Sequence, residues 1–209
     1  MKDEGYIKFN CNWIEEELPN NLNIDSINFW RQELYDQSLI GAYDDGIGYG
    51  NISQRLPEGS FFISGTATGK IKQLTDSHYT CVTSFDVARN TLICHGPVKA
   101  SSESLTHAIV YESLPEVNAV VHIHNKTLWD KLLYKVPTTS AKIEYGTPEM
   151  ANEINRLLAK TNLKEIKVLA MAGHEDGIIA FGKDLEEAAN IFLLHPEILP
   201  AGKHGGATP

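Results

Sequence analysis

Short β-forming runs fill the chain between residues 46 and 96, and turn-forming residues separate each run from the next. The runs read YGNIS, FFISG, YTCVTSFDV and TLICH, with Gly, Pro, Asn and Asp between them. Strands of this length joined by short turns pair with their sequence neighbours, so the segment predicts an antiparallel meander. The fold of this chain is therefore expected to contain an antiparallel sheet.

The residues before the meander predict one more strand and a helix. Apolar and polar residues alternate from residue 7 to residue 13, and this period of two indicates a half-buried strand. Apolar residues then recur at helical spacing from Ile27 toward Ile40, and either Asp25 or Ser26 can cap that helix.

The residues after the meander predict helices that alternate with strands. Three further helices are expected from their starting residues: one at Ser101 or Ser102, one at Thr147 with Pro148 in the first position, and one at Asp184 with Glu187 completing a capping box. Three apolar runs predict strands: residues 118–124, IKVLAMAG and GIIAFG. We expect one mixed α/β domain over residues 1–200, with a mainly antiparallel sheet flanked by helices, and a flexible tail over the Gly-rich residues 201–209.

Charge and cysteine usage exclude several classes of protein. The 18 basic and 27 acidic residues give a formal charge of −9, which argues against nucleic-acid or anionic-membrane binding. The sequence has no long apolar run and no secretory signal, so we expect a cytoplasmic protein. Its three cysteines share no CxxC spacing and are expected to be buried free thiols.

Three histidines predict a metal site. His122 and His124 are two residues apart in an expected strand, so both side chains point to the same face. His174 lies between two expected strands and would complete a three-imidazole set, which suits Zn²⁺ with one coordination position left open. Sequence alone also allows an accidental histidine pair and a solvated loop histidine.

Three other segments predict an anion pocket beside that metal. Ser101 and Ser102 lie at an expected helix N-terminus, where unpaired backbone N–H groups attract anions, although they could equally form a plain helix cap. Glu103 follows them and could act as a general acid/base, while His107 one turn later is left as a supporting or core residue. Two Gly-rich segments, GYGNISQR and ISGTATGK, could approach an anion closely or simply form tight turns.

The ordered set GNIS, ISGTATG, SSESLTH, VVHIHN and GHEDGIIAFG resembles the class II aldolase/adducin family over about residues 26 to 194. The resemblance implies a single α/β/α domain with a central antiparallel sheet, assembled as a homotetramer with active sites at subunit interfaces. Enzymes of this family include L-fuculose-phosphate and L-rhamnulose-phosphate aldolases, L-ribulose-phosphate 4-epimerase and methylthioribulose-phosphate dehydratase.

The resemblance also implies roles for individual residues. It assigns one Zn²⁺ per chain, or another divalent metal, to His122, His124 and His174, and proton transfer to Glu103. The phosphate-binding set it implies consists of Asn51, Gly65, Thr66, Ser101 and Ser102, with Thr68 as an alternative to Thr66 because the loop is one residue longer than usual.

Two departures from the family pattern bear on the reaction. Glu175 and Asp176 separate His174 from the glycine that usually follows it, so an extra carboxylate could enter the site. The catalytic tyrosine of the fuculose-phosphate aldolases has no clear counterpart, although Tyr134 and Tyr145 are nearby in sequence.

The expected function is a zinc-dependent lyase that cleaves or forms a C–C bond in a small phosphorylated keto-sugar or related hydroxycarbonyl compound. The metal would stabilise an enediolate while Glu103 moves the proton. Epimerisation, dehydration and decarboxylation use the same stabilisation and stay open. Two readings without turnover are an adducin-like scaffold and a metal-dependent sugar-phosphate binding module.

Overall fold

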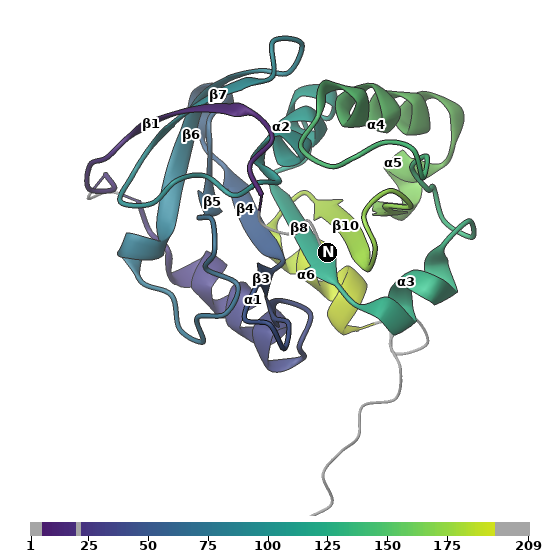
Figure 1. Ribbon diagram of the computed structural model, residues 1–209, viewed down its shortest axis with the longest axis horizontal. Helices are drawn as coiled ribbons and strands as arrows, with labels where there is room; N and C mark the ends of the chain where they lie inside the picture. Colours follow the sequence, from purple (N-terminus) through teal and green to yellow (C-terminus); the bar gives the residue numbers. More distant parts are fainter. Residues whose placement is uncertain (1–5, 20–21, 195–209) are drawn as a thin grey trace, which may run out of the picture.

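An eight-stranded sheet forms the centre of the molecule (Figure 1). The computed structural model describes residues 6–19 and 22–194, so the tail predicted at 201–209 lies outside the described residues. The strands follow one another across the sheet in the order β1 (Asn10–Ile14), β7 (Thr91–His95), β6 (Tyr79–Asp86), β5 (Phe61–Ser64), β4 (Asn51–Arg55), β8 (Ala119–His124), β10 (Gly177–Gly182) and β9 (Val168–Ala170). A small hairpin joins β2 (Gly41–Ala42) to β3 (Gly48–Tyr49) beside it.

The predicted meander is confirmed, because β4, β5, β6 and β7 pair antiparallel with their sequence neighbours. The turn between β6 and β7 ends at Asn90, whose φ of 54° is a left-handed conformation that asparagine tolerates well. The strand expected over residues 7–13 is found as Asn10–Ile14 and pairs with β7 in parallel. This one parallel pair makes the sheet mixed, whereas all its other strand pairs are antiparallel.

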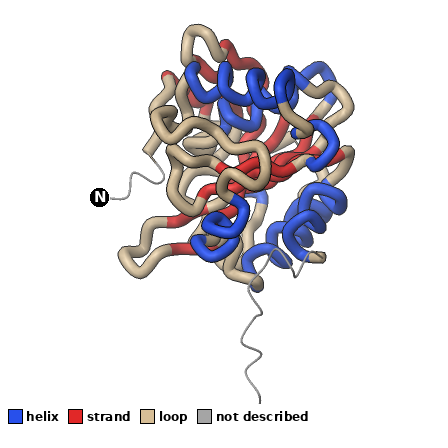
Figure 2. Tube along the Cα trace, turned by 90° about the vertical axis from the view of Figure 1, so that its right-hand side faces the viewer, coloured by secondary structure: helices blue, strands red, loops and turns tan. Residues whose placement is uncertain are grey.

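Helices cover both faces of the sheet, so the layers are helix, sheet and helix (Figure 2). One face packs against α2 (Ser104–Ser113), α4 (Pro148–Lys160) and the short α5 (Leu163–Ile166). The other face packs against α1 (Asp25–Asp36), α3 (Lys126–Leu132) and α6 (Leu185–Leu193). Two single 3₁₀ turns, Pro57–Gly59 and Asp76–His78, lie in the connections. The predicted α/β domain with a mainly antiparallel sheet is confirmed.

Two of the predicted helix starts are right and two are wrong. Thr147 caps α4 by accepting a hydrogen bond from the Met150 amide, and Asp184 caps α6 in the same way. Glu187, however, accepts from the Lys183 amide and not from the amide of Asp184, so the capping box is incomplete. The N-cap of α1 is Ile24, whose apolar side chain cannot accept a hydrogen bond, and the Asn23 carboxamide oxygen accepts from the Asp25 amide instead.

The start of α2 also differs from the prediction. Its N-cap is Glu103, two residues after Ser101, because the amide of Ser104 donates to the Ser101 carbonyl and closes a turn before the helix begins. The Ser101 hydroxyl accepts from the Glu103 amide at 3.4 Å within this turn. Ser101 and Ser102 therefore belong to a turn in front of the helix and do not cap it.

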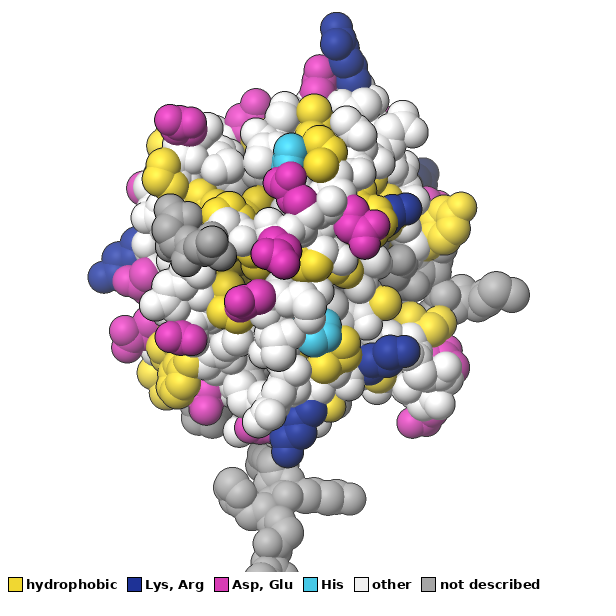
Figure 3. Space-filling view, turned by 90° about the vertical axis from the view of Figure 1, so that its left-hand side faces the viewer, with side chains coloured by type: hydrophobic (Ala, Val, Ile, Leu, Met, Phe, Trp, Pro, Cys, Tyr) yellow, Lys and Arg dark blue, Asp and Glu magenta, His cyan; other side chains and the backbone are white. Residues whose placement is uncertain are grey.

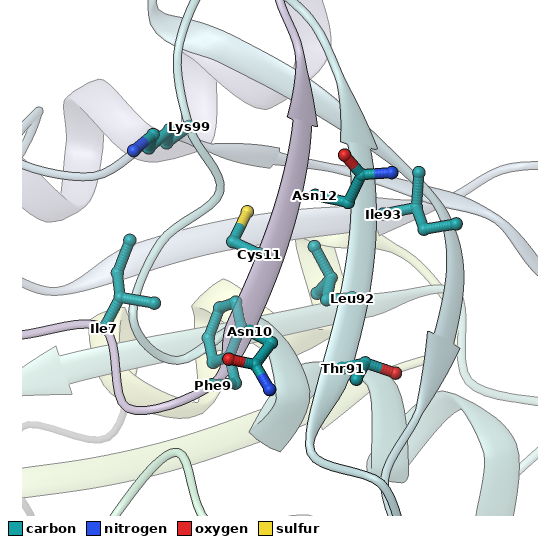
Figure 4. A pocket seen from close by; sticks show the side chains of 9 residues that line it. All are labelled: Ile7, Phe9, Asn10, Cys11, Asn12, Thr91, Leu92, Ile93 and Lys99. Atoms are coloured by element: carbon teal, nitrogen blue, oxygen red, sulfur yellow. The ribbon is translucent and has the colours of Figure 1, made fainter.

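Two of the three cysteines are buried as expected, whereas Cys11 is only half-buried. Cys81 and Cys94 are buried free thiols, and the half-buried Cys11 lies with its sulfur 3.6 Å from that of Cys94. Cys11 also borders an open cavity along β1 and β7 (Figure 4). Acidic side chains are scattered over the face of the molecule shown in Figure 3. None of the helices in the described ranges is long and apolar enough to span a bilayer.

Candidate active site

Strand β8 places the first two histidines at its carboxyl end. The backbone register sets His122 opposite Asn51 of β4 and sets His124 opposite Gly177 of β10. Both imidazoles are almost completely buried, with exposed fractions of 0% and 3%. Since β8 has strands on both sides, this pair is held rigidly within the sheet.

The connection between β9 and β10 brings in the third histidine. The His174 amide donates to the Met171 carbonyl and the His174 carbonyl accepts from the Gly177 amide, so the connection is a tight double turn. Asp176 takes a φ of 68° within it. Because β10 runs antiparallel to β8, this turn lies at the same sheet end as His122 and His124.

The three imidazoles converge, which the sequence could not show. Their ring centroids are 4.7 Å apart for His122 and His124, 5.3 Å for His122 and His174, and 4.7 Å for His124 and His174. One nitrogen from each ring lies within 4.8 Å of the other two. This group is buried and fits a divalent metal, since three neutral imidazoles form the usual open zinc site.

Two observations support a metal at this point. In the described part of the chain, the buried Nε2 atom of His122 has no hydrogen-bond partner, which is costly unless a ligand satisfies it. A Cβ atom at Gly177 would lie 3.2 Å from that same Nε2 atom and 2.6 Å from Cδ2 of His174. Glycine at this position therefore leaves the space in front of the imidazoles open.

Burial keeps the His122 imidazole uncharged. Desolvation lowers the pKa of His122 well below its usual value, and the neighbouring His124, His174 and His107 lower it further. Neutral imidazoles have the lone pairs that metal coordination requires. The uncharged imidazole can therefore bind a metal cation without first losing a proton.

Tyrosine side chains orient the outer histidine, and sequence reasoning missed them. The Tyr43 hydroxyl lies 2.7 Å from Nδ1 of His124 and its ring meets the imidazole edge-on. The Tyr49 ring packs on the same imidazole at a centroid distance of 5.6 Å. Because Nδ1 of His124 is hydrogen-bonded to Tyr43, Nε2 is the nitrogen of this imidazole that is left for a metal. Both tyrosines come from the β2–β3 hairpin, and no motif in YDDGIGY marks them.

Glu103 borders the histidines, as expected for a proton carrier. Its side chain is completely buried, and Oε1 lies 3.5 Å from Nε2 of His174. Its place as the N-cap residue of α2 sets the carboxylate directly after the Ser101–Ser102 turn. A carboxylate so close to the imidazoles can exchange a proton with a substrate held there.

A small cavity next to the histidines contains all five residues of the predicted anion pocket. It is lined by Gly48, Gly50, Asn51, Gly65, Thr66, Ala67, Thr68, Gly69, Ser101 and Ser102. The side-chain nitrogen Nδ2 of Asn51 is 3.5 Å from Nδ1 of His122, so Asn51 lies between the cavity and the histidines. The Thr68 hydroxyl donates to the Gly65 carbonyl, so its proton is used within the loop and Thr66 is the better candidate for a ligand contact.

The remaining candidate residues lie in supporting or distant positions. His107 is buried beneath β4, where its Nδ1 is 2.7 Å from the Ser53 hydroxyl. The Tyr145 ring packs on the His174 ring at a centroid distance of 4.3 Å and a tilt of 42°, whereas Tyr134 is 73% exposed. Asp176 is buried and, with His124 and Tyr43, lines a second cavity of about 370 Å³.

Comparison with known proteins decides the family. Residues 42–198, about three quarters of the chain, match the family described as the class II aldolase and adducin N-terminal domain. The chain belongs to this family. Solved structures share the fold: an L-fuculose 1-phosphate aldolase has a TM-score of 0.62 at 18% identity, with 84% of this chain and 81% of that chain covered. A sugar-phosphate aldolase from Thermotoga maritima has a TM-score of 0.57 at 22% identity, with 86% and 96% covered.

A relative in sequence carries a different enzyme name. The methylthioribulose-1-phosphate dehydratase of Leptospira biflexa is 26% identical over 177 residues, which cover 66% of this chain and 78% of the dehydratase. The protein is thus a class II aldolase family member with a buried three-histidine metal site. Family membership by itself leaves aldol cleavage, dehydration and epimerisation as separate possibilities.

Proposed function

We propose that this protein is a zinc-dependent lyase acting on a small phosphorylated keto-sugar. The observation that carries the proposal is the convergence of three buried imidazoles, with one nitrogen from each within 4.8 Å of the others, beside a carboxylate 3.5 Å from His174. A divalent ion held by these imidazoles would act as a Lewis acid on the substrate's carbonyl oxygen.

The chain's own residues would position the substrate and move a proton. Asn51, Thr66 and the Ser101–Ser102 turn would bind the phosphate, since they line the cavity that adjoins His122. A phosphate bound there fixes where the carbonyl end of the substrate lies. Glu103, with one carboxylate oxygen 3.5 Å from His174, would then take a proton from, or return it to, the carbon next to that carbonyl.

Aldol cleavage is our first assignment for the reaction, and dehydration is the second. The first assignment takes its reaction from the L-fuculose 1-phosphate and sugar-phosphate aldolases that share the fold. The sequence likeness to the Leptospira dehydratase favours the second assignment. Both reactions need a proton carrier next to a stabilised carbonyl, so the same residues serve either one. Tyr145 is buried with its ring centroid 4.3 Å from that of His174, and its hydroxyl donates to the Tyr6 carbonyl at 3.5 Å.

A substrate panel tests the proposal. Zinc-loaded protein is incubated with phosphorylated keto-sugars and with their unphosphorylated counterparts, and the products are identified by mass spectrometry. Aldol cleavage yields two carbonyl fragments, whereas dehydration yields one product that has lost a water molecule. Turnover of phosphorylated compounds only is the expected result.

A scaffold or a binding module without turnover predicts a different outcome. Such a protein would neither convert any compound nor exchange the proton next to the carbonyl when the bound compound is kept in D₂O. If a zinc-loaded, folded protein shows neither conversion nor exchange across the panel, the enzyme assignment is wrong.

A further inference from the structure

Arg31 of α1 is a buried cation that binds the back of the loop forming the anion cavity. Its side chain is only 2% exposed. The guanidinium donates hydrogen bonds to three backbone carbonyls: to Lys72 at 2.7 Å, to Gly69 at 2.9 Å and to Thr68 at 3.2 Å. Thr68 and Gly69 both line the cavity, so the guanidinium contacts the other side of its wall.

The Arg31 charge has no carboxylate partner among the described residues. Its neighbours are carbonyl oxygens and the Tyr35 ring, which lies 4.6 Å from the guanidinium carbon. Burial lowers the pKa of Arg31 from its usual value, yet a guanidinium stays protonated in proteins. A buried positive charge without a direct ion pair is costly, and Asp36 interacts with the Arg31 charge without forming such a pair.

The peptide groups held by Arg31 turn their N–H bonds in the opposite direction. In a trans peptide the carbonyl and the N–H point opposite ways, and the described chain contains no cis peptide. The carbonyls of Thr68 and Gly69 point to Arg31, so the amides of Gly69 and Lys70 point away from it. A Cβ atom at Gly48, another residue of the cavity wall, would lie 3.2 Å from each of those two amide nitrogens.

The cavity itself contains no positively charged side chain among its lining residues. A phosphate group carries up to two negative charges and needs either cations or aligned N–H dipoles to replace its hydration. The amides of the loop would supply the dipoles, and Arg31 is a buried cation hydrogen-bonded to that loop.

We propose that Arg31 is a positioning residue for phosphate binding: it holds the Thr68–Gly69 and Gly69–Lys70 peptides with their N–H groups toward the anion cavity, and it supplies the positive charge behind them. This inference rests on the anion cavity of the proposed function. The ligand class it addresses is a phosphate monoester.

Arg31→Gln removes the charge and most of the hydrogen bonds. We expect the affinity for inorganic phosphate to fall by about 10- to 100-fold, the range for losing hydrogen bonds to a charged group. Arg31→Lys keeps the charge but cannot reach three carbonyls at once, so we expect a smaller loss. For a phosphorylated substrate, KM should rise while kcat changes little, and KM for its unphosphorylated counterpart should not change.

Arg55 provides a matched control. It is a partly buried arginine that, like the fully buried Arg31, donates to three backbone carbonyls: those of Val117 and Tyr111 at 2.7 Å and that of Leu114 at 3.0 Å. These acceptors belong to the end of α2 and the residues after it, and none of them lines the anion cavity. Arg55→Gln should therefore lower thermal stability in a similar way without changing phosphate affinity.

Calorimetric titration of inorganic phosphate into the zinc-loaded wild type and the three variants decides the question. The expected result is weaker binding for Arg31→Gln, partial recovery in Arg31→Lys and wild-type affinity in Arg55→Gln. Wild-type affinity in Arg31→Gln, or an equal loss in Arg55→Gln, overturns the role of Arg31 and leaves the cavity intact. If Arg31→Gln does not fold, unchanged phosphate affinity in Arg31→Lys overturns it. A wild type that binds no phosphate overturns the cavity itself, and the role of Arg31 with it.

Discussion

Replacing Tyr43 by Phe removes one hydroxyl from behind the candidate metal centre and leaves the ring in place. That hydroxyl lies 2.7 Å from Nδ1 of His124, a short hydrogen bond in a partly buried setting. When Nε2 of an imidazole binds a metal, Nδ1 carries a proton and needs an acceptor. Phenylalanine offers none, so the imidazole loses its orientation and part of its basicity.

The expected magnitude follows from that single lost bond. Losing the outer partner of a metal-binding histidine typically costs about 10- to 100-fold in metal affinity. Each factor of ten corresponds to about 1.4 kcal/mol, so Tyr43→Phe should weaken zinc binding by about 1.4 to 2.8 kcal/mol. The zinc dissociation constant is measured by competition with a chromophoric chelator, and the cobalt-substituted protein gives an absorption spectrum that reports the ligand geometry.

Tyr49→Phe is the control for this measurement. The Tyr49 ring also packs on His124, but its hydroxyl donates to the Ser38 carbonyl at 3.3 Å and not to the imidazole. Removing it should leave both the zinc affinity and the cobalt spectrum unchanged. Equal zinc affinities for wild type, Tyr43→Phe and Tyr49→Phe would refute the reasoning, as would an equal loss in both variants.

Four further predictions test the site and the core. The Glu103→Gln variant should keep its zinc, while its turnover falls by roughly 10²- to 10⁴-fold, the range for losing a general acid/base. Near-normal turnover would show that Glu103 does not carry the proton. His124→Ala should lose most of the one zinc ion expected per chain, measured by metal analysis of the folded protein, and full retention contradicts the ligand assignment. Ser102→Asp should weaken phosphorylated ligands through like-charge repulsion and leave zinc content unchanged; undiminished binding of those ligands speaks against the pocket. Burial lowers the pKa of His107 from 6.5 to about 3. Between these pH values the imidazole is protonated in the unfolded chain but not in the folded protein. The free energy of unfolding therefore falls as the pH is lowered, by up to about 1.4 kcal/mol per pH unit. His107→Asn should reduce that slope in denaturant titrations of the zinc-free protein, and an unchanged slope shows that His107 does not cause it.

Local patterns predicted the elements of the fold better than their boundaries. The meander follows from strand length and turn residues, which act over a few neighbouring positions. The starts of α1 and α2 were placed wrongly because capping depends on how the preceding backbone folds. Before α2, the turn closed by Ser101 delays the helix until Ser104, and a list of good capping residues contains no information about that turn.

The site shows the same division between local and tertiary information. The pairing of His122 with His124 on one face follows from the two-residue period of a strand. The approach of His174 depends on the antiparallel register of β8 and β10, which the sequence does not specify. Tyr43 and Arg31 could not be found in advance, because a tyrosine in a polar loop and an arginine on a helix are ordinarily exposed, and only the packing of distant segments buries their polar ends.

The parallel pairing of β1 with β7 has a consequence for synthesis on the ribosome. Asn10 is translated about 80 residues before its partner Thr91. At roughly 5 to 20 residues per second, the first strand waits about 4 to 16 seconds for the edge it joins. During that time Trp13 and its apolar neighbours have no strand beside them, and once β7 emerges its outer edge is open to any extended chain until β1 docks. Strand β1 can therefore join the sheet only after the meander up to β7 has been translated, and the outer edge of β7 is exposed to aggregation until β1 covers it.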